Sequence, residues 1–516
     1  MQEKWMRLWT ENKKTLLICM AAVMIFGLAA HGYTMLNFQL SHDSLDGLYA
    51  AGRENAHKIE LGRVLAPAYR YLFRGQFAMP WLTGLLAFVW IGLAAWMTMK
   101  VLEVRSVFQM VLICGLMTAN LTITALCGTF IHDFDQNMFC MMMACLAVLV
   151  WKYRPRGWML WGAIGSAICL GIYQAFISVA IGLIMIVMIM RLLNGEKWTA
   201  VVWDGILGAV MVGIGGVLFF ILLKGVLAMT DIPIAQRNNS LYMLKLLGLD
   251  DIPGLVKGIY RNFWDYFRNM PNTWLAPKAA ALINCVLFGF AGLALTVGTL
   301  IRKRLSLMSR LLVMGIAALL PLGLNVCYLL TSGFVHHLMQ YAFILIYILC
   351  LLLAGEICQK LKERIPACRF VQAACSALVL LIVWSGVQTA NTYHFQKTST
   401  VMATRTHMTG VYHDMLEEGY IPGETPLVVV GEVPISIPAG FEETTKIWPG
   451  WYPNAITSDH KSIRSYFSFV FGDRAAFCTE EEWAHVTNDL YVQDMPCYPN
   501  DGYVDYLDEV MVVKLS

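Results

Sequence analysis

Residues 16–46 read LLICMAAVMIFGLAAHGYTMLNFQLSHDSLD, and the change of character near residue 37 decides how the chain is organised. The first part is an apolar run of about 20 residues, the length that an α-helix needs to cross the hydrocarbon of a bilayer. No small-residue cleavage site follows it, so we interpret it as a retained helix and not as a signal peptide. We therefore expect the chain to leave a membrane here and to place His42 and Asp43 at its surface.

The composition of the whole chain supports this interpretation. Of 516 residues, 58% are hydrophobic and 14% are charged, which is far too apolar for a soluble domain. The net charge of +3 is too small to indicate a nucleic-acid partner. Most of the 14 cysteines lie inside apolar runs and no Cys-x-x-Cys pair is present, so we expect no metal site, redox motif or cofactor. The composition predicts an all-α polytopic membrane protein.

Eleven apolar runs are expected to span the membrane, and basic residues gather in every second connection between them. Cytoplasmic connections are the basic ones in membrane proteins, which places the N-terminus in the cytoplasm and the C-terminus outside. Residues 37–80 and 231–277 then form two large outer loops of a membrane domain at 1–390. The expected spans are 16–36, 81–99, 107–127, 136–151, two within 158–190, 200–227, 279–301, 311–330, 338–355 and 370–390.

The stretch 158–190 admits two interpretations. One long helix would place Arg156 and Arg191 on opposite sides of the membrane. Two short spans that turn near Tyr173 and Gln174 keep both basic residues on the cytoplasmic side, in agreement with the charge rule. We adopt the second interpretation.

The first outer loop is rich in charge. On an ideal helix of about 100° per residue, Glu60, Arg63, Arg70 and Arg74 share one face, although Pro67 is expected to kink or split that helix. Arginines at an outer surface suit a phosphate-bearing ligand, so the three arginines are candidate phosphate-binding residues. Attraction to anionic lipid headgroups is the alternative.

The second outer loop and the C-terminal segment carry further patterns. Residues 253–270 are amphipathic, with a helix cap expected at Asp251, and are predicted to lie on the outer leaflet. Residues 391–516 are predicted to form a small extracytoplasmic α/β domain, with strands near 426–431 and 509–515. Cys478 and Cys497 are its only cysteines, and they are candidates for a disulfide on that oxidising side.

Polar residues at the expected outer ends of separate spans form the candidate site. An ion-coupled transporter would place charges near the membrane midplane, whereas the span interiors here are nearly free of charge. Each residue also has a plainer interpretation, as a helix cap, an aromatic-belt residue or a group among lipid headgroups. The candidate substrate-binding residues are His42, Glu60, His132, Asp133, Asp135, Tyr173, Gln174, His336 and His337.

Several short motifs resemble the type II Gtr glucosyltransferases, bacterial membrane enzymes associated with O-antigen glucosylation. These are His42-Asp-Ser-Leu45, Glu60-Leu-Gly-Arg63, Pro80-Trp-x-x-Gly84, Ile172-Tyr-Gln-Ala175 and, in the tail, Met495-Pro-x-Tyr-Pro499. The resemblance implies a GT-C-like architecture and a polyprenyl-phosphate-glucose donor used on the outer face of the bacterial inner membrane. Such enzymes keep an acidic residue in the first outer loop, and Asp43 matches that position.

The resulting hypothesis is an inverting glycosyltransferase in which Asp43 is the general base. Its acceptor is a surface polysaccharide or glycolipid, and a companion flippase and donor synthase would supply the donor. Arg63, with Arg70 or Arg74, would stabilise the leaving lipid phosphate, while Asp133 or Asp135 would bind acceptor hydroxyls. Rival interpretations are a flippase for the same lipid-linked sugar and a polysaccharide ligase or polymerase of related architecture.

Overall fold

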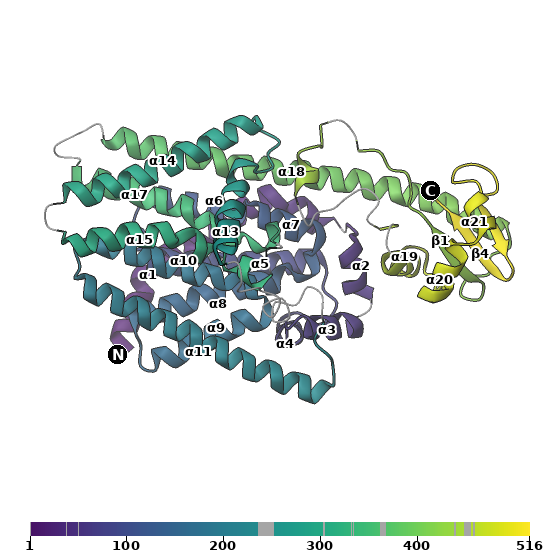
Figure 1. Ribbon diagram of the computed structural model, residues 1–516, viewed down its shortest axis with the longest axis horizontal. Coiled ribbons are helices and arrows are strands. Elements are labelled where there is room, and N and C mark those ends of the chain that lie inside the picture. Colours follow the sequence, from purple (N-terminus) through teal and green to yellow (C-terminus); the bar gives the residue numbers. More distant parts are fainter. Residues whose placement is uncertain are drawn as a thin grey trace.

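The computed structural model describes residues 2–516 except 38, 50, 236–251, 303–304, 332, 334, 362–367, 438–439, 448–455 and 458–459. A helical bundle forms most of the molecule, and a small domain extends from one end of it (Figure 1). We call residues 418–516 the tail and this end of the bundle the tail end. The bundle helices are α1 (Gln2–Leu36), α5 (Pro80–Val101), α6 (Val107–Thr118), α7 (Leu121–Thr129), α8 (Phe134–Tyr153), α9 (Trp158–Ile172), α10 (Ile177–Leu193), α11 (Trp198–Thr230), α14 (Pro277–Ile301), α15 (Leu307–Leu324), α17 (Leu345–Leu361) and α18 (Cys368–Glu417).

The polytopic helical architecture is confirmed. Within the described residues, nine helices are long and apolar enough to cross a membrane, or ten if the bent pair α6 and α7 counts as one span. The predicted count of eleven also includes α9, which is apolar but has only 15 residues. The pair α6 and α7 bends by 40° because Asn120 caps a new helix, its side chain accepting the amide N–H of Ile123.

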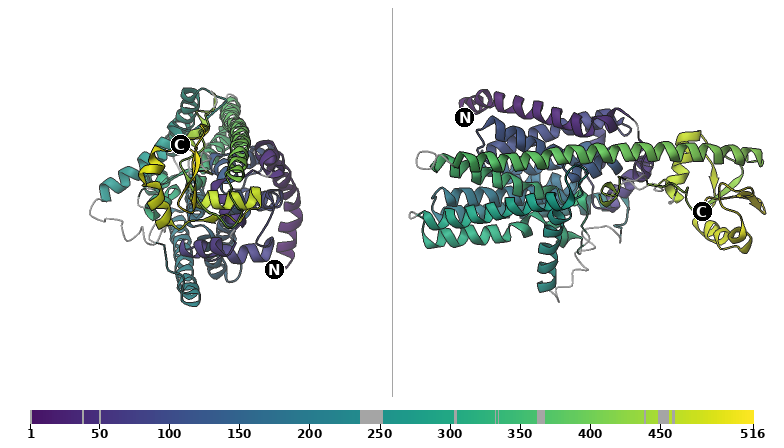
Figure 2. Two further views of the ribbon diagram at one scale, coloured as in Figure 1. Left: turned by 90° about the vertical axis from the view of Figure 1, so that its right-hand side faces the viewer. Right: turned by 90° about the horizontal axis from the view of Figure 1, so that it is seen from above.

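The turn between α9 and α10 settles the interpretation of residues 158–190. Asp204 of α11 forms ion pairs with both Arg154 and Arg191. Both basic clusters therefore lie at the same end of the bundle, and the chain reverses at Tyr173 and Gln174 as predicted. The N-terminus lies at that end too, away from the tail (Figures 1 and 2).

Helix α13 (Ile252–Arg268) runs across the other helices of the bundle (Figure 1). Its amphipathic pattern is confirmed, and the aromatic part of its apolar face packs against protein, whereas its position on the outer leaflet stays a prediction. Phe263 and Phe267 are buried against Phe288 of α14 and Phe343. The expected cap at Asp251 and residues 236–251 of the same loop lie outside the described part of the chain.

The tail is joined to the bundle by α18, a helix of 50 residues that is seen along its whole length in Figure 2. The predicted domain boundary at residue 390 falls inside this helix. The tail sheet has the strand order β2-β1-β4-β3, formed by β1 (Pro426–Val430), β2 (Ala476–Phe477), β3 (Val504–Leu507) and β4 (Val510–Lys514). Strand β1 is parallel to both β2 and β4. The strands predicted near 426–431 and 509–515 are therefore present.

The predicted disulfide of the tail is not formed, because both Cys478 and Cys497 are free. Cys478 directly follows the edge strand β2, whereas Tyr498, next to Cys497, donates its N–H to Lys514 of β4. Strand β1 lies between these two strands, so they are separated by about 10 Å. The Cα atoms of a disulfide lie within about 7 Å of each other.

Candidate functional site

The N-terminus of α2 (His42–Tyr49) presents Asp43. Ser41 precedes the helix, its hydroxyl accepts the amide N–H of Ser44, and the Ser44 hydroxyl accepts the N–H of Ser41. This reciprocal pair caps the helix in the manner of a capping box. The Ser41 hydroxyl also lies 2.7 Å from the carbonyl oxygen of Thr129, at the end of α7. The cap therefore fixes Asp43 with respect to the bundle.

The Asp43 side chain is 41% exposed, and its carboxylate lies 3.1 Å from Nε2 of His42. One side of α2 packs on the 3-10 helix η1 (Ile131–Asp133), and α19 (His460–Tyr466) of the tail packs on α2 as well. The hydroxyl of Ser462 on α19 donates to the carbonyl of His42 at 3.5 Å. Asp43 thus lies where the bundle meets the tail, with its side chain partly exposed.

The segment Glu60-Leu-Gly-Arg63 ends a helix and does not continue it. Helix α3 spans Ala51–Glu60, and Gly62 follows with a φ of +76°. The N–H of Arg63 bonds to the carbonyl of Lys58, and that of Gly62 bonds to the carbonyl of Ile59, which is the Schellman pattern of a helix end. The prediction that Glu60, Arg63, Arg70 and Arg74 share one helix face is therefore wrong. Helix α4 (Ala66–Phe73) begins afresh, with Pro67 in its first turn.

The side chain of Arg63 packs against the turn between α9 and α10. Its guanidinium stands 4.5 Å from the ring centroid of Tyr173, a cation–π contact. The side-chain amide of Gln174 donates to the carbonyl of Gly62 at 3.1 Å. The N–H of Leu65 donates to the carbonyl of Gly171 at 2.9 Å. Tyr173 and Gln174 hold the Arg63 turn in place, a role that the sequence did not indicate. In the described part of the chain, Arg63 forms no ion pair with a carboxylate.

His336 and His337 lie near this turn. Burial, the Arg63 guanidinium and His337 lower the pKa of His336 to about 3, so its imidazole is neutral at physiological pH. The carbonyl of His337 accepts the hydroxyl of Thr122 at 2.6 Å, and its ring lies against Tyr266. Glu60 is partly exposed and lies 3.4 Å from Nδ1 of His57.

The other two candidate arginines are held in a buried ion network. Arg70, only 2% exposed, donates to both Asp133 (2.6 Å) and Glu54 (3.2 Å). Arg74 donates to Asp135 at 2.7 Å and to the carbonyl of His132 at 2.5 Å. Because these donors are already satisfied by buried acceptors, Arg70 and Arg74 have little capacity left for a ligand phosphate. We correct the assignment of Arg70 and Arg74 from phosphate binding to structure, and that of Asp133 and Asp135 from acceptor binding to structure.

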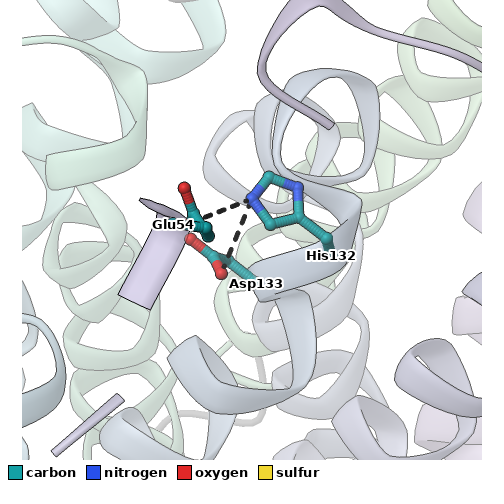
Figure 3. Close-up of side chains that lie close together, drawn as sticks. All are labelled: Glu54, His132 and Asp133. Atoms are coloured by element: carbon teal, nitrogen blue, oxygen red, sulfur yellow. Dashed lines mark ion pairs between the residues drawn. The ribbon is translucent and has the colours of Figure 1, made fainter. Parts of the chain in front are cut away.

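Glu54, His132 and Asp133 lie at the centre of this network (Figure 3). Each offers one possible ligand atom within 4.8 Å of the others, close enough for a metal ion. However, Nζ of Lys58 already lies 2.7 Å from Glu54 and 2.5 Å from Asp133. Lys58, Arg70 and Arg74 balance the three carboxylates of Glu54, Asp133 and Asp135. A further cation would meet no excess of negative charge, so the cluster fits an ion-pair network better than a metal site.

The charges of this network lead us to expect that the stability of the fold depends on pH. Burial opposes ionisation of Glu54, but Lys58 and His132 outweigh it and hold the pKa of Glu54 well below its ordinary value of 4.5. A carboxylate with a lowered folded pKa stabilises the fold above its unfolded pKa and loses that contribution as the pH falls. We expect Glu54→Gln to lower the unfolding free energy by about 3–5 kcal/mol at neutral pH. The deficit should shrink below about pH 4.5.

Thermal unfolding in detergent between pH 3 and pH 7 measures this deficit. The matched control is Glu424→Gln, which removes an exposed carboxylate of the tail and should leave the curve of midpoint against pH unchanged. A Glu54→Gln deficit that stays constant down to pH 3 would show that ionised Glu54 does not stabilise the fold.

Glu54 and Lys58 are members of the site that the sequence did not single out. Their spacing of four residues on α3 places both on one helix face, and this was the available signal. Gly62, as a helix-ending glycine, was a second one. Neither signal identifies the distant partner Asp133.

A family model described as glucosyl transferase GtrII matches residues 32–347. The chain belongs to the GtrII glucosyltransferase family. The matched region contains α2, the Arg63 turn, the ion network and both His336 and His337, and it ends before the tail. No curated protein and no solved structure matches the chain. The likeness of Met495–Pro499 to the family therefore stays a prediction.

Proposed function

We propose that this GtrII protein transfers glucose from a polyprenyl-phosphate-glucose donor to a hydroxyl of a surface polysaccharide or glycolipid. The reaction would take place on the outer face of the bacterial inner membrane, in an enzyme of the GT-C type. Arg63 carries the proposal, since it is the one of the three candidate arginines Arg63, Arg70 and Arg74 that has no carboxylate partner in the described residues. A guanidinium of this kind binds phosphate oxygens with charge-assisted hydrogen bonds.

The proposed reaction is a single displacement with inversion. The Asp43 carboxylate takes the proton of the acceptor hydroxyl as its oxygen attacks the anomeric carbon of the donor. The bond between that carbon and the phosphate oxygen breaks, and the lipid phosphate leaves as an anion. Such a leaving group needs no general acid, but its charge needs stabilisation, which Arg63 provides.

The arrangement of α4 supports a substrate held at the membrane surface. Arg70 points into the protein, whereas Tyr71 and Leu72 point outward and are 85% and 73% exposed. Outward apolar side chains directly before the span α5 suit contact with lipid and not with water. Arg63, which precedes α4, would then lie near the depth of lipid phosphates. We further propose that the tail, through α19, covers the Asp43 region and holds the acceptor.

Synthetic polyprenyl-phosphate hexoses, supplied one at a time with an acceptor, test the function. We expect the glucose donor to be consumed and one hexose to be added to the acceptor. Consumption of no donor would contradict the proposal. Movement of intact donor across vesicles without an acceptor would identify a flippase, and a missing polymer block in the surface glycan would identify a polymerase or ligase.

Replacement of Arg63 by Ala tests the phosphate contact. We expect the KM for the donor to rise by about 10- to 100-fold, because a charge-assisted hydrogen bond contributes about 1.5–3 kcal/mol. Steady-state kinetics with varied donor measures it. Arg268→Ala removes an exposed arginine of the other large loop and should leave the KM unchanged. Equal effects of the two replacements would favour general attraction to lipid headgroups over a phosphate site.

A further inference from the structure

Three consecutive residues of α18 bind three different parts of the chain. Lys397 is completely buried and donates from Nζ to the carbonyls of Gly128 (2.7 Å) and Gln39 (3.3 Å). The hydroxyl of Thr398 accepts the side-chain amide of Gln39. The side-chain carbonyl of Gln396 accepts the hydroxyl of Thr444, which follows the sheet strand β1. We call Gln396, Lys397 and Thr398 the α18 clamp.

The two carbonyls that Lys397 binds flank the cap of the Asp43 helix. Gln39 lies two residues before Ser41, the residue that caps α2. Gly128 lies one residue before Thr129, whose carbonyl accepts the Ser41 hydroxyl. Lys397 therefore bonds to both of the chain segments that the Ser41–Thr129 hydrogen bond joins. It connects the start of α2 with the end of α7, which leads directly into η1.

A lysine is a costly residue for this position unless its bonds are used. Removing an ammonium group from water is unfavourable, whereas an apolar side chain of similar length would fill the same space without that cost. Hydrogen bonds from a buried lysine side chain to carbonyl oxygens form in a low-dielectric environment, where the attraction is strong. The position of Lys397 therefore strengthens the connection at the one place where the Asp43 helix begins.

We propose that Lys397 is a positioning residue of the transfer reaction, which holds Asp43 in place through the carbonyls of Gln39 and Gly128. Through Gln396 and Thr444, the same turn of α18 connects this point to the tail. The inference rests on the proposed function, because it concerns the placement of the proposed base. Lys397 itself does not contact the substrate.

The experiment compares Lys397→Met with Thr404→Val in the full-length protein. Thr404 is buried on the same helix two turns later, and its hydroxyl bonds to Thr400 of its own helix. For Lys397→Met we expect kcat to fall by about 10- to 100-fold with the donor KM unchanged. A displacement of a catalytic group by about 1 Å lowers the rate by up to about that factor. Thr398→Val keeps Lys397 but removes the hydroxyl that accepts the side-chain amide of Gln39. It should lower kcat as well, but by a smaller factor.

Hydrogen–deuterium exchange of residues 41–49 gives a readout that does not depend on activity. The amides of α2 should exchange about 10-fold faster in Lys397→Met, because the cap of that helix is loosened, and at the wild-type rate in Thr404→Val. Unchanged exchange with kcat near the wild-type value would overturn the proposal, as would equal effects of Thr404→Val. If the wild-type protein consumes no donor, the proposed function fails, while the exchange of α2 still decides whether Lys397 positions Asp43.

Discussion

Replacement of Asp43 by Asn is expected to lower transfer by about 10²- to 10⁴-fold, the range that a positioned general base contributes. The amide has nearly the same shape as the carboxylate but does not take up the acceptor proton. Since the Asp43 side chain is 41% exposed and lies outside the buried network, the fold should keep its stability. Donor binding should also be retained, because Arg63 is unchanged. Rates of hexose transfer and donor affinity, both measured on purified protein, test this expectation.

The matched control for this variant is Asp265→Asn on α13. Asp265 is 44% exposed and pairs with an exposed arginine, so its loss should leave the rate within a factor of two or so of the wild-type rate. Transfer that persists in Asp43→Asn would refute the assignment of the base. A parallel loss of expression or of donor binding would show that Asp43 has a structural role instead.

Replacement of Arg70 by Met is expected to destabilise the protein by about 3–5 kcal/mol, the cost of breaking a buried ion pair from one side. The variant leaves Asp133 and Glu54 in the interior with Lys58 and His132 as their remaining basic neighbours among the described residues. Met fills a similar length, so the loss of charge dominates the effect. Denaturant or thermal unfolding in detergent measures it, and donor affinity measured on the folded fraction should be close to that of the wild type.

Arg261→Ala is the control for Arg70→Met. Its side chain is 78% exposed and lies 3.7 Å from Asp265, so we expect a change of less than about 1 kcal/mol. If Arg70→Met instead keeps full stability and weakens donor binding, Arg70 belongs to the phosphate site and our correction is wrong.

The difference between Arg63 and Arg70 shows why the first loop was only partly predictable. All three arginines look alike in the sequence, because spacing along one segment gives no information about distant partners. Asp133 and Asp135, more than 50 residues later, determine that Arg70 and Arg74 are neutralised. The glycine at Gly62 turns the chain before α4 begins, so that Arg63 points to Tyr173 instead.

The sequence by itself determined the membrane spans, the reversal at Tyr173 and Gln174, the tail strands and the family motifs. These features depend on local runs, on charge at helix ends and on hydrophobic periodicity, all of which are encoded within about 20 neighbouring residues. Only the tertiary structure decided which of the three arginines has no carboxylate partner in the described residues. It also decided that α13 packs against protein, that Cys478 and Cys497 stay apart, and that Lys397 reaches the cap of the Asp43 helix. Such contacts join residues that are tens to hundreds of positions apart, and their energies depend on burial and geometry that no local pattern contains.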